Sequence, residues 1–148
     1  MNTLSSNTAF LAFAFACVVL CINLMFLWGC SGAVRNNVKS TPNAEDVLQF
    51  KTKLAEVDPP DIARVLRAHS NAQASIYPFL LLGLVYVLAG GPGTPAIVYF
   101  AAFCTARILH SVAYLKGKQP WRTVFFTVSF LITIALLVHV LWLLVMTM

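Results

Sequence analysis

Charged residues are scarce in this chain. They make up 10% of its 148 residues, whereas a soluble domain carries about 25%. Hydrophobic residues make up 59%, and the mean hydropathy is +0.81, so too few polar side chains exist to cover a folded surface in water. The composition excludes an ordinary soluble globule, a disordered chain and a disulfide-stapled secreted domain. It is typical of an integral membrane protein.

Acidic residues are absent from the chain after Asp61, and all five lie between Glu45 and that residue. Basic residues continue beyond it, at Arg64, Arg67, Arg107, Lys116, Lys118 and Arg122. A nucleic-acid partner requires basic residues on an exposed polar surface, whereas these stand among Leu, Val and Phe. The sequence therefore predicts no nucleic-acid partner.

Cysteine spacing gives no sign of a disulfide framework or a metal site. The four cysteines form no CxxC motif and no cluster with histidine at zinc-ligand spacing. Cys17 and Cys21 share one face of an apolar run, where a thiol acts as a small packing residue. We expect no bound metal.

Long apolar runs are the dominant feature of what is present. A spanning helix needs about 20 apolar residues, and the expected spans are about 8–29, 61–88, 96–115 and 121–147. The first run is too long for the core of a signal peptide, and no basic residue precedes it. The sequence predicts an all-α, four-helix transmembrane bundle that forms one domain over residues 1–148.

The connections between these runs differ in charge. Residues 31–60 form a polar connection, with a short helical turn predicted near 43–50 and a helix start at Pro59-Pro60-Asp61. This connection and the turn at 116–120 carry all the loop lysines and Arg35, while the turn at 90–95 carries no charge. By the positive-inside tendency, both basic loops face the cytoplasm and both termini face the other side.

Arg107 is the sharpest anomaly in the apolar runs. It lies roughly 12 Å inside the end of its helix, at 1.5 Å per residue, where an arginine costs about 2.5–3.5 kcal/mol on insertion scales. His110 and Tyr114 follow at i+3 and i+7 and share its face. This stripe must face protein or a polar cavity.

Cations from all four helices reach one level of the predicted bundle. They include Arg35, Arg67 and Arg122, with Asn71 following Arg67 on the same face and Thr123 beside Arg122. Several arginines with no acid favour an anion with more than one acidic group, because a guanidinium binds carboxylates in a bidentate way. Lipid-facing walls favour a second, apolar reactant from the bilayer. Basic residues at helix ends also bind lipid headgroups, so a plain lipid-binding bundle is an alternative.

Four motifs, in order along nearly the whole chain, resemble those of the MAPEG superfamily (membrane-associated proteins in eicosanoid and glutathione metabolism). They are Asn43-Ala-Glu45-Asp46, Arg64-Val-Leu-Arg67-Ala-His69-Ser-Asn71 with Ile76-Tyr77-Pro78-Phe79, Arg107-Ile-Leu-His110-Ser-Val-Ala-Tyr114, and Pro120-Trp-Arg122. The branch that looks most similar is that of microsomal glutathione transferase 1 and microsomal prostaglandin E synthase 1.

The resemblance implies a homotrimer with glutathione bound between neighbouring subunits at the cytoplasmic side. Carried over by matching position, the residues at the glutathione site are Arg35, Arg67, Asn71, Arg107, His110, Tyr114, Arg122 and Phe126. Three catalytic roles follow from the same resemblance. Arg122 would stabilise the thiolate by lowering the thiol pKa, Thr123 would hydrogen-bond the sulfur, and Asp46 would pair with Arg122 or transfer protons.

This chain departs from the family pattern at three places. Ala72-Gln73-Ala74 stands where the family runs Asp-x-Glu, and that glutamate normally helps to hold glutathione. Ser70 stands where the synthase has an arginine, and Phe126 where it has a tyrosine. The last two departures favour a transferase or peroxidase, whereas Tyr77-Pro78 resembles the synthase.

These residues are consistent with two functions. The first is a membrane enzyme that activates glutathione to conjugate lipophilic electrophiles, or to reduce or isomerise lipid peroxides. The second is a non-catalytic, lipid-presenting protein of the same superfamily.

Overall fold

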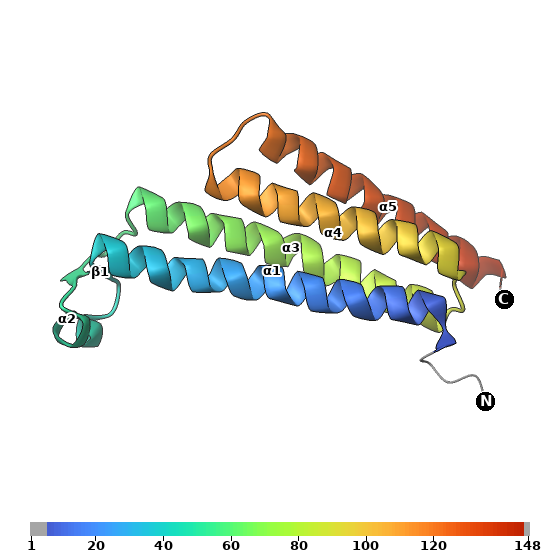
Figure 1. Ribbon diagram of the computed structural model, residues 1–148, viewed down its shortest axis with the longest axis horizontal. Helices are drawn as coiled ribbons and strands as arrows, with labels where there is room; N and C mark the ends of the chain where they lie inside the picture. Colours follow the sequence, from blue (N-terminus) through green and yellow to red (C-terminus); the bar gives the residue numbers. More distant parts are fainter. Residues whose placement is uncertain (1–5, 147–148) are drawn as a thin grey trace.

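A computed structural model describes residues 6–146, and over this range the molecule is helical apart from one small strand pair (Figure 1). The elements are α1 (Thr8–Val38), β1 (Ser40–Thr41), α2 (Ala44–Phe50), β2 (Lys53–Leu54), α3 (Pro60–Leu88), α4 (Gly93–Leu115) and α5 (Trp121–Met146). Four of these helices, α1, α3, α4 and α5, are long and apolar enough to cross a membrane. The predicted helical bundle is confirmed, and the chain is an integral, multi-pass membrane protein.

Helix α1 is longer than the apolar run that predicts it. It begins after Asn7, whose side chain accepts a hydrogen bond from the Phe10 backbone N–H at 3.1 Å. It continues past the apolar residues to Val38 and ends at Lys39, whose φ is 54°. No proline interrupts the chain before Pro42, so the helix extends in a polar form beyond the membrane-spanning part. Arg35 therefore lies on a helix and not in a loop.

The segment between α1 and α3 folds as a small cap. Strands β1 and β2 pair in parallel, with Ser40 opposite Lys53, and α2 lies between them in the chain. The helical turn predicted at 43–50 is confirmed by α2. Arg35 and Asp58 form an ion pair at 2.8 Å, which ties the end of α1 to the approach to α3. We call this end of the molecule, together with the turn at 116–120, the basic end.

Helix α4 is the most enclosed of the four long helices and packs against both α1 and α5. Its aromatic side chains form much of the core: Phe103 stacks on Phe79 of α3, with ring centroids 3.6 Å apart, and Phe100 packs edge-on against the same ring at 5.7 Å. Gly83 of α3 lets the Phe100 ring approach, because a Cβ there would lie 2.7 Å from Phe100 Cε1.

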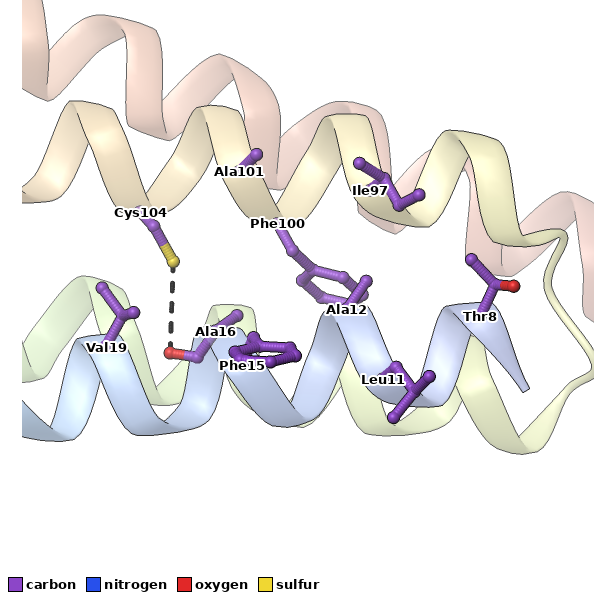
Figure 2. A pocket seen from close by; sticks show the side chains of 10 residues that line it. All are labelled: Thr8, Leu11, Ala12, Phe15, Ala16, Val19, Ile97, Phe100, Ala101 and Cys104. Carbon is purple, nitrogen blue, oxygen red and sulfur yellow. Dashed lines mark hydrogen bonds between the residues drawn. The ribbon is translucent and has the colours of Figure 1, made fainter. Parts of the chain in front are cut away.

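An apolar groove of about 380 Å³ lies between α1 and α4, away from the basic end (Figure 2). Thr8 stands at one end of it and Cys104 at the other, with Phe15, Ile97 and Phe100 among the side chains between them. The Cys104 thiol is 4.0 Å from the Ala16 carbonyl oxygen. Such a lining suits hydrocarbon chains and lacks the cations that an anionic ligand requires.

The close approach at Gly83 generates a stability prediction. Gly83→Ala pushes a methyl group against a ring held by Phe13 and Phe79, and overpacking of this kind costs about 1–3 kcal/mol. Gly29→Ala is the matched control, since it is also helical and a Cβ there meets nothing within 4 Å. Thermal unfolding in detergent should show a lower midpoint for Gly83→Ala and an unchanged or higher one for Gly29→Ala. Equal midpoints would contradict the packing described.

Candidate functional site

The turn between α4 and α5 brings two predicted site residues together. Gly117 ends α4 with φ 63°, its N–H donates to the Tyr114 carbonyl, and the Lys118 N–H donates to the Ala113 carbonyl. This is the double hydrogen bond of a Schellman C-cap, which favours glycine at the left-handed position. The reversal places Arg122 in the first turn of α5 against the last turn of α4. The Arg122 guanidinium carbon lies 4.8 Å from the centre of the Tyr114 ring.

A polar cavity of about 280 Å³ opens between three helices at the basic end. Its lining residues are Asn71, His110, Tyr114, Arg122, Thr123 and Phe126. They come from α3, α4 and α5, and all six were predicted as site residues from the sequence. His110 is 2% exposed, and its ring packs against Tyr114 at 5.6 Å and Phe126 at 6.1 Å. The cavity therefore combines one cation with hydroxyl, amide and imidazole groups.

Arg107 lies behind the wall of this cavity. Its side chain is fully buried and is not among the lining residues. Nη2 donates to Asn71 Oδ1 at 2.9 Å and to the Asn71 carbonyl at 3.3 Å, and Nη1 reaches Ser129 Oγ at 3.5 Å. The prediction that this arginine must face protein or a polar cavity is met by hydrogen bonds to α3 and α5.

The hydrogen bond to Arg107 also sets how Asn71 faces the cavity. A guanidinium has donors only, so the amide oxygen must turn toward it. Asn71 lines the cavity, and with its oxygen engaged, its side-chain NH₂ group is the donor that it can offer to a ligand. Arg107 acts on the cavity through Asn71 rather than by direct contact.

Gln119 holds Arg122 from the turn. In the amide orientation that satisfies both neighbours, its oxygen accepts from Arg122 Nη2 at 2.7 Å and Nε at 3.2 Å, and its nitrogen donates to Thr123 Oγ1 at 3.1 Å. The guanidinium is thus fixed on one side by an amide and on another by the Tyr114 ring. This ordering leaves Arg122 pre-positioned for a ligand.

A second cavity, of about 430 Å³, adjoins the first between α3 and α5. It shares Asn71 and Phe126 with the polar cavity. Its other lining residues are Ala74, Ser75, Pro78, Ser129, Phe130 and Thr133. The surface is mostly apolar, and the two cavities together join a cationic end to an apolar one.

The remaining predicted site residues lie elsewhere in the chain. Arg35 and Asp46 line a separate cavity of about 480 Å³ in the cap. There Asp46 accepts hydrogen bonds from Thr41 Oγ1 at 3.3 Å and Asn43 Nδ2 at 3.0 Å. Arg67 is exposed and lines neither cavity. Within one described chain, therefore, Asp46 does not share a cavity with Arg122.

Two residues of the site were missed by the sequence reasoning. Ser129 completes the Arg107 cluster, and Gln119 orients Arg122. Ser129 had a visible signal, because Arg122, Phe126, Ser129 and Thr133 follow one face of a helix at spacings of three and four. Gln119 had none, since its role depends on the path of the turn.

Comparison with known proteins agrees with the motifs. The profile of the MAPEG family matches residues 13–142. The chain is 36% identical over 138 residues to a protein of Homo sapiens named prostaglandin E synthase, covering 93% of this chain and 91% of that one. It is 33% identical over 142 residues to microsomal glutathione S-transferase 1 of Sus scrofa, covering 92% and 91%. The chain belongs to the MAPEG family.

Proposed function

We propose that this protein is a glutathione-dependent membrane enzyme, which activates the thiol to conjugate lipophilic electrophiles or to reduce or isomerise lipid peroxides. One observation carries the proposal. The cavity between α3, α4 and α5 gathers Arg122, Thr123, Tyr114, His110 and Asn71 around one space. The names of the relatives, a prostaglandin E synthase and a glutathione S-transferase, support the same chemistry.

The donor set of the cavity fits glutathione. This tripeptide carries a thiol and two carboxylates, and the cavity offers a guanidinium, an amide NH₂ group and two hydroxyl groups. Charge-assisted hydrogen bonds of this kind are the strong ones. When bound, glutathione supplies the nucleophilic sulfur, and the chain supplies the groups that hold it.

Arg122 is the residue that stabilises negative charge on the sulfur. A nearby guanidinium lowers a thiol pKa, and the thiolate is the reactive form. Thr123 offers a hydroxyl donor from the same turn of α5, while Tyr114 and Gln119 are positioning residues for Arg122. Because the guanidinium is already ordered, little reorganisation is needed when charge develops.

The adjoining cavity between α3 and α5 is the place for the lipophilic reactant. Pro78, Phe130 and Ala74 give it apolar walls, and it meets the polar cavity at Asn71 and Phe126. A reactant dissolved in the bilayer would thus reach the thiol without crossing water. The identity of the electrophile is not set by such interchangeable apolar residues.

The assembly is proposed as a homotrimer with its glutathione sites between subunits and facing the cytoplasm. Arg35 and Asp46 carry anion-binding and proton-transfer chemistry but lie in the cap, apart from the Arg122 cavity of their own chain. A neighbouring copy would bring Arg35 and Asp46 to that cavity, whereas Arg67 lies one turn before Asn71 on the same helix. The basic end faces the cytoplasm by the positive-inside tendency.

The role of Arg122 generates a prediction for turnover. Arg122→Ala should lower thiol-dependent turnover by about 100-fold, the size seen when one donor to developing charge is removed. Lys118→Ala is the matched control, because it removes a cation from the same turn without touching either cavity. Ultraviolet absorbance of bound thiolate on adding glutathione should disappear in the first variant and remain in the second. If Arg122→Ala turned over as fast as the parent, Arg122 would not be the residue that stabilises the thiolate.

A site shared between copies generates a complementation prediction. Arg35→Ala and Arg122→Ala subunits should each show strongly reduced turnover alone, and turnover should rise when both are expressed together. In a mixed ring, the intact Arg35 of one subunit can meet the intact Arg122 of another. The control pair is Arg122→Ala with Thr123→Ala, since both residues line the same cavity and every site keeps one defect. Recovery in the control pair, or none in the first pair, would contradict the shared site.

The second candidate is a lipid-presenting protein without catalysis, favoured by the apolar walls of the α3–α5 cavity. It predicts lipid binding without any thiolate signal in the parent protein. The absorbance titration above therefore separates the two functions.

A further inference from the structure

Three polar atoms inside the bundle have no hydrogen-bond partner among the described residues. They are Asn23 Nδ2 on α1, and Arg107 Nε and Ser111 Oγ on α4. The three residues are 7%, 0% and 3% exposed, so bulk water does not reach these atoms. Buried polar groups in proteins are normally paired, and an unpartnered one is costly. The cluster therefore points to a bound group that is not part of the chain.

Asn23 and Ser111 lie at one level of the bundle. The Cys104 thiol on α4 meets the Ala16 carbonyl on α1 at 4.0 Å (Figure 2), and the two helices run in the same direction (Figure 1). Seven residues further, which is about two helical turns, each helix presents the same face again. Those positions are Asn23 and Ser111. Arg107 stands one turn before Ser111 on the same side of α4.

Helix α3 adds no polar side chain at this level. A Cβ on Gly83 would lie 3.1 Å from Phe13 Cδ2 of α1, and α1 and α3 run in opposite directions (Figure 1). Ten residues further along α1 is Asn23, and eleven residues back along α3 is Ala72. Ala72 is fully buried and carries only a methyl group. The three unpartnered atoms thus face a part of α3 whose side chain supplies neither an acceptor nor a charge.

The cluster also carries a positive charge without a counter-ion. The Arg107 guanidinium donates to neutral oxygen atoms of Asn71 and Ser129, and among the described residues no carboxylate lies within ion-pair distance of it. Its side chain is fully buried within a single chain, so a neighbouring subunit cannot reach it to supply the missing charge. A buried charge is stable only when it is compensated.

The unpartnered groups match an anion better than a water molecule. The guanidinium N–H of Arg107, the amide NH₂ group of Asn23 and the hydroxyl group of Ser111 can all donate. A water molecule among them would need acceptors for its own hydrogen atoms, and the two oxygen atoms of Asn71 already accept from Arg107. A monatomic anion accepts from all three donors and neutralises the guanidinium, and such charge-assisted hydrogen bonds are the strong ones.

We propose that a chloride ion binds in the core between α1, α3 and α4, held by Asn23, Arg107 and Ser111. The ion pairs with the Nε side of a guanidinium whose terminal nitrogen atoms hold Asn71 and Ser129. It supports the wall of the Arg122 cavity without contacting that cavity. The inference does not depend on the proposed function, because it concerns a site that no thiol reaches.

The test is the thermal midpoint of the full-length protein in detergent, without any thiol, in sodium chloride and in sodium gluconate at equal ionic strength. Gluconate is too large for a site inside the bundle. The parent midpoint should rise with chloride and saturate, by about 3–6 °C at ten times the dissociation constant. Ser111→Ala and Asn23→Leu should lose this rise. Thr105→Ala is the matched control on α4, because its hydroxyl group donates to the Ala101 carbonyl, and it should keep the rise.

Bromide locates the ion without any variant. Crystals of the parent protein soaked in sodium bromide should show anomalous density beside Asn23, Arg107 and Ser111. Equal parent midpoints in chloride and gluconate would overturn the inference. A chloride-dependent rise that persists undiminished in both Ser111→Ala and Asn23→Leu, or bromide found only on the protein surface, would overturn it as well.

Discussion

The buried guanidinium of Arg107 is the constraint on which the site depends. An arginine deep in a membrane-spanning helix is costly unless its donors are satisfied, and none of the spanning segments offers an acid after Asp61. The two terminal nitrogen atoms of Arg107 donate to neutral oxygen atoms, two on Asn71 of α3 and one on Ser129 of α5, while Nε has no partner among the described residues. Interhelical hydrogen bonds of this kind fix neighbouring helices in a bilayer. They set α3, α4 and α5 around one cavity and leave the side-chain NH₂ group of Asn71 as the donor that it can offer to a ligand.

The tight turn between α4 and α5 is the second constraint, because it places Arg122 beside this cavity. The left-handed Gly117 ends α4 so abruptly that Tyr114 and Arg122 face each other across the reversal. Arg122 is then held by the ring and by Gln119. The result is an ordered positive charge at the mouth of a cavity whose far side becomes apolar. That juxtaposition suits a reaction between a water-soluble thiol and a lipid-soluble partner.

Much of this arrangement could be predicted because membrane helices impose simple rules. Arg107, His110 and Tyr114 stand on one helical face, and a charged residue at that depth must turn inward. The spacing therefore predicts a polar cavity. It does not distinguish a residue that lines the cavity, such as His110, from one that supports its wall. That distinction depends on how α3 and α5 pack, and it places Arg107 behind Asn71.

Other features depend on the course of the backbone in turns and helix ends, which the local sequence pattern does not specify. Helix α1 continues to Val38 because nothing stops it, although its apolar run ends earlier. Gln119 reaches Arg122 only because the turn has one particular course. Arg35 and Asp46 lie in the cap, apart from the Arg122 cavity of their own chain. Their action at the Arg122 cavity of a neighbouring copy stays a prediction.

The most direct test of the account is the thermal midpoint of the detergent-purified protein with and without excess glutathione, in the parent and in Arg107→Ala. A ligand that binds only the folded state raises its apparent stability. The account predicts a rise in the parent and none in Arg107→Ala, because Asn71 and the three helices lose the group that positions them. Asn71→Ala should also lose the rise while it keeps both arginines, which separates loss of the cavity wall from loss of charge. An equal rise in the parent and in Arg107→Ala would contradict the central claim.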